Sequence, residues 1–202
     1  GGSGITPMMS MIREVTDRGL DRRMHLLYGS RESSDIIYRE ELEQRAAAHE
    51  NLTVDFVISE PEPGYQGLTG FIDRKLLQGR LGDLSNKTFF LCGPEAMYRF
   101  CQKELEALGL RRKQIRVEVY GPPSDVTAQP GWPDGLAADA TFKVHVSDGR
   151  TLEVMAGEPL LCGLERQHLE LPSACRSGEC SYCRVKLRSG TVFHAKGARL
   201  RK

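Results

Sequence analysis

Three cysteines in the last part of the chain have a spacing that suits iron–sulfur chemistry. Cys175, Cys180 and Cys183 follow the pattern C-x4-C-x2-C, which occurs among the thiolate ligands of 2Fe–2S clusters. The spacing is short because a single loop must wrap its thiolates around two irons. Small residues between them, such as Ser177 and Gly178, let backbone N–H groups turn toward the sulfides and stabilise the negative charge. The loop is therefore predicted to hold a cluster.

Two other interpretations of these cysteines stay open. Together with His194 they could hold a structural zinc ion in a Cys3His site, although the spacing suits zinc less well. Cys180 and Cys183 also form a C-x-x-C pair, as in thiol oxidoreductases, but this pair follows a hairpin and a helix instead of opening a helix.

A glycine-rich turn at the start of the chain could bind a phosphate group. Gly1-Gly2-Ser3-Gly4 leads through Thr6 into a helix that is predicted to begin at Pro7. Backbone N–H groups and the helix dipole favour an anion such as a pyrophosphate at this position. The turn lacks the G-x-G-x-x-G fingerprint, so taken alone it is equally compatible with a turn that binds nothing.

The elements that must position these residues follow two patterns. Up to residue 120, apolar strands at 24–28, 52–59, 88–92 and 115–120 alternate with helices at 7–17, 36–49, 73–81 and 94–108. This alternation predicts an α/β fold with a doubly wound parallel sheet. Residues 121–139 contain four prolines and no periodicity, which predicts a linker. From residue 140, a hairpin, a helix at 158–167 and two short strands around Ser189-Gly190 predict a small α+β domain.

Both parts resemble known families. The turn at 1–7, the motif Cys92-Gly93-Pro94 and the sheet pattern between them resemble the nucleotide domain of the ferredoxin–NADP reductase superfamily over residues 1–120. Residues 140–202 resemble a plant-type 2Fe–2S ferredoxin domain with a β-grasp fold. The order of the two domains resembles that of reductases of the phthalate-dioxygenase and vanillate-demethylase type.

The resemblance implies a nucleotide site at the carboxyl edge of the sheet. The resemblance implies catalytic roles for Thr6 and Cys92 near the nicotinamide, and for Glu118 near a flavin. Cys92 could instead be a core residue, and Glu118 could belong to an ordinary edge strand. The residues expected to bind the nucleotide are Gly2, Ser3, Gly4, Thr6, Pro7, Ser30, Arg31, Glu60, Cys92, Gly93 and Pro94.

The adenosine end of this site favours NADH over NADPH. Relatives that use NADP tend to place Ser-Arg where this chain has Ser59-Glu60. Glu60 would repel a 2′-phosphate, yet it could accept a hydrogen bond from a free ribose hydroxyl. A glutamate that simply faces solvent is an equally good interpretation.

The resemblance implies an electron-transfer function. A nicotinamide gives up two electrons as a hydride while a 2Fe–2S cluster accepts one, so a flavin (FMN or FAD) must lie between them. The expected protein passes electrons from NADH through flavin and cluster to a partner such as an oxygenase. We interpret the chain as truncated at both ends, because the flavin barrel, the first strand of the sheet and a fourth cysteine are missing from it. The alternative is a non-enzymatic relay or interaction module with a degenerate or zinc-occupied cysteine site.

The overall charge of the chain gives no indication that it binds polyanions. The chain has 28 basic and 27 acidic residues, a net charge of +1, which gives no electrostatic case for binding nucleic acid or an anionic membrane. It has no long apolar run and no charged-then-apolar leader. We therefore expect a cytoplasmic protein with reduced cysteines.

Overall fold

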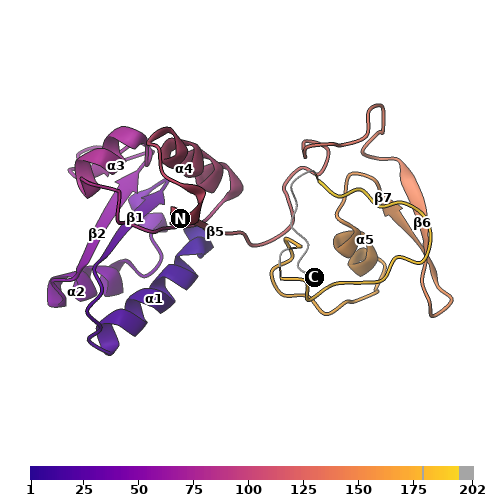
Figure 1. Ribbon diagram of the computed structural model, residues 1–202, viewed down its shortest axis with the longest axis horizontal. Coiled ribbons are helices and arrows are strands. Elements are labelled where there is room, and N and C mark those ends of the chain that lie inside the picture. The colour runs from indigo at the N-terminus through magenta and orange to yellow at the C-terminus, as the bar shows by residue number, and fades with distance from the viewer. Residues whose placement is uncertain (179, 196–202) are drawn as a thin grey trace. The chain divides into compact units, whose positions relative to one another are not determined.

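The computed structural model describes residues 1–178 and 180–195, which divide into two compact units (Figure 1). Unit 1 is Gly1–Glu118, and unit 2 begins at Val119. Unit 2 takes in the segment 121–139 that was predicted to be a linker. The domain bounds 1–120, 121–139 and 140–202 stay a prediction.

Unit 1 is built from parallel strands and the helices that connect them. Its helices are α1 (Ile5–Asp17), α2 (Arg39–Ala48), α3 (Arg74–Leu81) and α4 (Glu95–Ala107). Its strands are β1 (Met24–Ser30), β2 (Leu52–Ile58), β3 (Leu68–Thr69), β4 (Phe89–Cys92) and β5 (Ile115–Glu118). The strands pair in the orders β1-β2-β3 and β4-β5, and every pair is parallel. The predicted α/β class with parallel pairing is confirmed.

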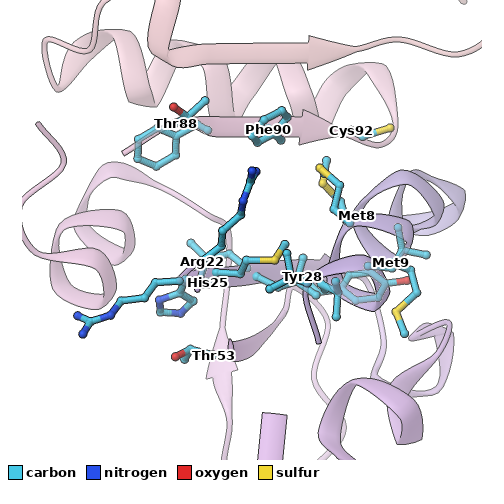
Figure 2. Close-up of a pocket in the computed structure, with 18 of the residues that line it drawn as sticks. Met8, Met9, Arg22, His25, Tyr28, Thr53, Thr88, Phe90 and Cys92 are labelled. Carbon is cyan, nitrogen blue, oxygen red and sulfur yellow. The ribbon is translucent and has the colours of Figure 1, made fainter. Parts of the chain in front are cut away.

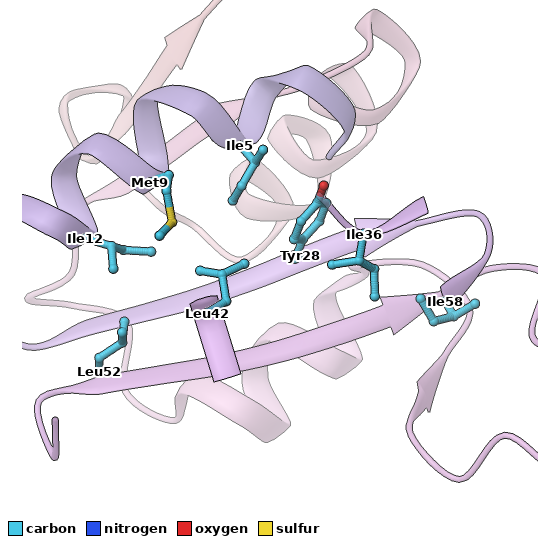
Figure 3. Packing of buried hydrophobic residues seen from close by; sticks show 8 residues of the cluster. All are labelled: Ile5, Met9, Ile12, Tyr28, Ile36, Leu42, Leu52 and Ile58. Atoms are coloured by element: carbon cyan, nitrogen blue, oxygen red, sulfur yellow. The ribbon is translucent and has the colours of Figure 1, made fainter. Parts of the chain in front are cut away.

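The core of unit 1 lies between β1 and β2 and the helices α1 and α2 (Figure 3). Ile5, Met9 and Ile12 recur at helical spacing on one side of α1 and are almost fully buried. Tyr28 of β1 lies among them, and its hydroxyl oxygen accepts a hydrogen bond from the Ile37 N–H at 3.2 Å. A buried tyrosine needs such a partner for its polar end. This packing fixes α1, and hence the turn before it, against the sheet.

The helix starts differ from the predicted ones for local reasons. α1 begins two residues before Pro7, which is tolerated because the first-turn N–H groups of a helix have no intrahelical acceptor. α2 begins at Arg39 and not at residue 36, because Tyr38 has a left-handed backbone with a φ of 61°. The two-residue strand β3 was not predicted, since two residues show no periodicity.

Over its described residues, unit 2 contains one hairpin and one helix around a small core. The hairpin joins β6 (Thr141–His145) to β7 (Thr151–Met155), and α5 (Leu160–Arg166) packs on it through Leu164, Leu152 and Val154. The strands predicted around Ser189-Gly190 are wrong: residues 184–195 form no strand. Val185 and Leu187 are more than half exposed, so the burial that would hold a strand in place is missing there. None of the helices in the described ranges has the length and apolar character needed to cross a bilayer.

Candidate functional site

The glycine-rich turn lies between the carboxyl ends of β1 and β4. The amino group of Gly1 donates to the Cys92 carbonyl at the end of β4, at 3.2 Å. A Cβ atom on Gly1 would lie 2.6 Å from the Gly29 carbonyl oxygen near the end of β1. One residue therefore bridges the ends of both strands, and the turn occupies the edge at which open α/β sheets bind ligands.

Gly4 packs directly against the backbone of the Cys92-Gly93 motif. A Cβ atom on Gly4 would lie 2.5 Å from both the Cys92 carbonyl carbon and the Gly93 nitrogen, which is closer than real contacts allow. Gly93 itself has a φ of 155°, and Gly2 has a φ of 54°. The two motifs that lie about 90 residues apart in sequence thus form one packed structure, in which glycine is required at these positions.

The polar side chains of the turn support it from within. The Thr6 hydroxyl donates a hydrogen bond to the Ser3 carbonyl at 2.9 Å, and Pro7 follows in the first turn of α1. Gly4 is the residue at the amino end of this helix and provides no side-chain cap. The Gly4 N–H donates to the Gly1 carbonyl at 3.2 Å, and the Ile5 N–H donates to the carbonyls of Gly2 and Ser3, so the turn itself pairs two of the N–H groups at this end.

Cys92 and Glu118 lie side by side where β4 and β5 end, and Figure 2 shows Cys92 at this end of β4. They are direct partners in the parallel register of the two strands. Burial raises the pKa of the Cys92 thiol, and the nearby Glu118 carboxylate adds to this effect. The thiol is therefore neutral at physiological pH, which suits contact with a flat uncharged ring and excludes a role as a thiolate nucleophile.

The candidate adenosine-binding residues meet at the ends of β1 and β2. The Ser59 N–H donates to the Ser30 carbonyl at 3.0 Å, and the Glu60 N–H donates to the Arg31 carbonyl at 2.8 Å. The side chains of Arg31 and Glu60 are exposed. The structure thus places the predicted residues Ser30, Arg31 and Glu60 together on adjacent strands, with both charged side chains free to reach a ligand in solvent.

Met97 is a residue of this region that the sequence predicts to lie on the apolar side of the helix at 94–108, but not to contact the glycine-rich turn. Its sulfur and terminal methyl lie within 2.5–3.5 Å of the positions that Cβ atoms on Gly1, Gly29 and Gly93 would take. Met97 therefore packs beneath the turn, and three glycines leave room for it. Its place on the apolar face of α4, three residues after Pro94, is the sequence signal that could have indicated this contact.

The cysteine loop of unit 2 has some of the features of a cluster-binding loop. The Cys180 N–H donates to the Cys175 sulfur at 3.4 Å, and the Gly121 N–H donates to the Cys175 carbonyl at 2.8 Å. Arg176, Gly178 and Ser181 have positive φ angles, so the backbone turns sharply around the cysteines. The Ser177 hydroxyl is buried beside the Cys175 thiol, where it can donate to a thiolate or to a bound sulfide.

The cysteines of the loop are ligands of the kind that a 2Fe–2S cluster needs, but their sulfur atoms do not lie close together. Partial burial raises the pKa of the Cys175 thiol, but contacts with Ser177 and the Cys180 N–H outweigh this and lower it to about 6, which favours the thiolate that iron requires. In residues 1–178 and 180–195, however, no three cysteine, histidine or acidic side chains come close enough to hold a metal. Neither the three cysteines nor the Cys3His set with His194 is assembled in this part of the chain.

An ion pair ties the cysteine loop to α5. The Arg176 guanidinium donates to the Glu165 carboxylate at 2.5 and 2.7 Å, which lowers the pKa of Glu165. The Cys162 sulfur lies 3.8 Å from the same guanidinium. Cys162 therefore contacts the base of the loop and does not take part in its donor set.

Comparisons with known proteins account for both units. The family model described as oxidoreductase NAD-binding domain matches residues 1–103, and the one described as 2Fe-2S iron-sulfur cluster binding domain matches residues 144–202. The glycine betaine monooxygenase reductase subunit of Pseudomonas aeruginosa (strain UCBPP-PA14) is 29% identical over 204 residues, covering 95% of this chain and 56% of its own. The heme-dependent oxidative N-demethylase beta subunit of Ectopseudomonas mendocina (strain ymp) is 31% identical over 197 residues, covering 96% and 53%.

A solved structure shows the same fold for unit 1. The cytochrome b5 reductase domain of Ulva prolifera nitrate reductase superimposes with a TM-score of 0.54 and 29% identity, over 58% of this chain and 45% of that one. The chain spans about half the length of the curated relatives it matches. With half of its residues matched by one family and the cysteine domain by another, the chain belongs to the oxidoreductase NAD-binding domain family and carries a 2Fe–2S iron–sulfur cluster binding domain after it.

Proposed function

We propose that this chain is the nucleotide- and cluster-binding part of a reductase that passes electrons from NADH, through FMN or FAD, to a 2Fe–2S cluster and on to an oxygenase. The observation that carries the proposal is the presence of both family matches in one chain. Relatives named as a monooxygenase reductase subunit and an oxidative N-demethylase subunit support the oxygenase as partner. The non-enzymatic relay or interaction module is the competing function.

The residues of unit 1 would bind and orient the nucleotide. N–H groups of the Gly1–Gly4 turn and the amino end of α1 would bind the pyrophosphate. The neutral thiol of Cys92 and the backbone of Gly93 would contact the nicotinamide ring without adding charge. Thr6 would hold the turn in shape through its bond to Ser3.

Cys175, Cys180 and Cys183 would hold the cluster in unit 2. A cluster held there would supply single-electron transfer, which is the chemistry needed after a flavin has divided the electron pair of a hydride. The sharp turns at Arg176, Gly178 and Ser181 would direct backbone N–H groups at the sulfides, and the buried Ser177 hydroxyl would add a further donor. The Arg176–Glu165 ion pair would keep the loop on α5.

The test measures metal and nucleotide binding on the same sample. The chain is purified anaerobically and reconstituted with iron and sulfide in dithiothreitol, whose thiol can complete a cluster held by three protein cysteines. We expect about two irons and two sulfides per chain, a rhombic EPR signal after dithionite, and NADH binding by calorimetry. Zinc in place of iron, with no affinity for NADH, would overturn the proposal and favour the interaction module.

Glu60→Arg is expected to change the nucleotide preference. Removing a carboxylate and adding a guanidinium beside Arg31 favours a 2′-phosphate, so the ratio of NADPH to NADH affinity rises by at least about tenfold. Calorimetric titration with both nucleotides measures this ratio. Glu50→Arg is the matched control, because it makes the same charge change just before β2, at the opposite end of the strand. Equal ratios in both variants would show that Glu60 only faces solvent.

A further inference from the structure

The segment 121–139, which is rich in proline and glycine, begins with a hydrogen bond to the cysteine loop. The Gly121 N–H donates to the carbonyl of Cys175, the first of the three candidate ligands, at 2.8 Å. Gly121 has a φ of 82°, in the left-handed region that favours glycine. A Cβ atom there would meet nothing within 4 Å, so glycine is needed for the backbone conformation and not for space. Neither family match, over residues 1–103 and 144–202, includes this residue.

The later part of the same segment is also attached to unit 2. The Trp132 ring packs edge to face with the Phe193 ring, and their centroids lie 5.2 Å apart. Near the end of the segment, the Ala138 carbonyl accepts a hydrogen bond from the Gly157 N–H at 2.8 Å. A flexible linker is solvated and makes no such contacts with distant residues. The segment therefore gives Gly121 a fixed place from which to donate its hydrogen bond.

This hydrogen bond fixes how one peptide group of the loop is turned. The described residues contain no cis peptide bond, so the Cys175 carbonyl and the Arg176 N–H point in opposite directions. Because Gly121 holds the carbonyl on one side, the N–H is directed to the other side. Arg176 has a φ of 57°, which is unfavourable for a residue with a side chain. Contacts from outside the loop are needed to keep it in this conformation.

The ion pair of Arg176 with Glu165 cannot fix this peptide group by itself. The guanidinium and the carboxylate are 2.5–2.7 Å apart, which ties the loop to α5. Several rotatable bonds separate the guanidinium from the backbone, however, so the ion pair restricts where the loop lies more than how its peptide groups are turned. A bond to the carbonyl itself, such as the one from Gly121, has the direct effect on orientation.

We propose that Gly121 is a positioning residue for the cluster. Its N–H holds the Cys175 carbonyl away from the cluster site, so that the Arg176 N–H is directed at the cluster. Backbone N–H groups that face the sulfides or thiolates stabilise the negative charge of a cluster. Gly121 thus acts through the loop without touching the metal, and the segment 121–139 is a working part of the cluster-binding unit. This role rests on the proposed function.

The test replaces two glycines of the same segment by proline, one at a time. Proline has no N–H and cannot adopt a positive φ, so Gly121→Pro removes the bond to Cys175. Gly135→Pro is the matched control. Gly135 also has a positive φ, of 75°, and an open Cβ position, and among the described residues it makes no hydrogen bond to the cysteine loop. Both substitutions impose the same kind of backbone strain, so a difference between the two proteins reports the lost bond.

Two measurements are made on each protein. In the metal-free form, we expect Gly121→Pro to shift the ¹H–¹⁵N signals of residues 176–178, and Gly135→Pro to leave them unchanged. After anaerobic reconstitution with iron and sulfide in dithiothreitol, we expect Gly121→Pro to lose iron to an excess of chelator at least about tenfold faster than Gly135→Pro. Its reduced EPR signal should also have altered g values. Gly121→Ala keeps the N–H and should retain iron better than Gly121→Pro.

The outcomes separate the role of Gly121 from the proposed function. Faster iron loss and shifted loop signals in Gly121→Pro, but not in Gly135→Pro, support the positioning role. If the two proline variants lose iron equally fast and have equal loop signals, the positioning role is overturned, although the cluster function stands. If the unaltered chain binds no iron, the proposed function fails and the role toward a cluster fails with it. Shifted loop signals would then show only that Gly121 holds the loop.

Discussion

Gly4→Ala is expected to disable the nucleotide-binding end of unit 1. Gly4 has an ordinary helical backbone, with a φ of −64°, so alanine meets no conformational strain there. Its new methyl group would instead lie 2.5 Å from the Cys92 carbonyl carbon and the Gly93 nitrogen, which are backbone atoms that cannot rotate away. α1 must then move away from β4. We expect a loss of about 1–3 kcal/mol in the free energy of unfolding, and at least about tenfold weaker NADH binding.

Gly79→Ala is the matched control for this substitution. Gly79 lies inside α3, and a Cβ atom there would meet no atom within 4 Å. Alanine is the better helix former, so this variant should gain about 0.5–1 kcal/mol and bind NADH unchanged. Urea unfolding and calorimetry on both variants give the comparison. A Gly4→Ala protein as stable as the Gly79→Ala protein would show that the turn does not pack on the Cys92-Gly93 motif as described.

The parallel α/β architecture could be predicted because its signals are local. Apolar β-branched runs such as Val54–Ile58 alternate with segments of helical period, and Asp73 and Gly109 mark helix ends. The Asp73 side chain indeed accepts from the Leu76 N–H, so the predicted helix start is its cap. The family resemblance is what assigned Gly4, Cys92 and Glu60 to a site at the carboxyl edge of the sheet, where open α/β sheets bind ligands, and that assignment stays a prediction.

Features that depend on long-range geometry could not be predicted. Nothing near Tyr38 in sequence indicates a left-handed residue, and the role of Met97 beneath three glycines arises only from packing. The strands expected around Gly190 failed because alternation of apolar residues predicts a strand only where a partner covers one side. For the cysteines, spacing indicates the metal chemistry, but it cannot fix where each sulfur atom lies.

Cys180→Ser is expected to abolish cluster binding without unfolding unit 2. Serine has nearly the same shape, and Cys180 is exposed, so the free energy of unfolding of the metal-free protein should change by less than about 0.5 kcal/mol. Its hydroxyl is a far weaker ligand for iron than a thiolate. After anaerobic reconstitution, iron should fall from about two per chain to a small fraction of that, and the reduced EPR signal should be lost.

Cys162→Ser distinguishes a specific ligand from any nearby sulfur. Cys162 lies in α5, and its sulfur contacts the Arg176 guanidinium at the base of the same loop. It is therefore close to the loop but lies outside the C-x4-C-x2-C pattern, so the variant should keep its iron. Equal iron loss in both variants would mean that any substitution near the loop weakens iron binding, so that Cys180 would not be shown to be a ligand. If the Cys180→Ser protein still bound zinc, the cluster assignment would be contradicted. Such a result would mean that the metal site of this loop does not need the Cys180 thiolate as a ligand.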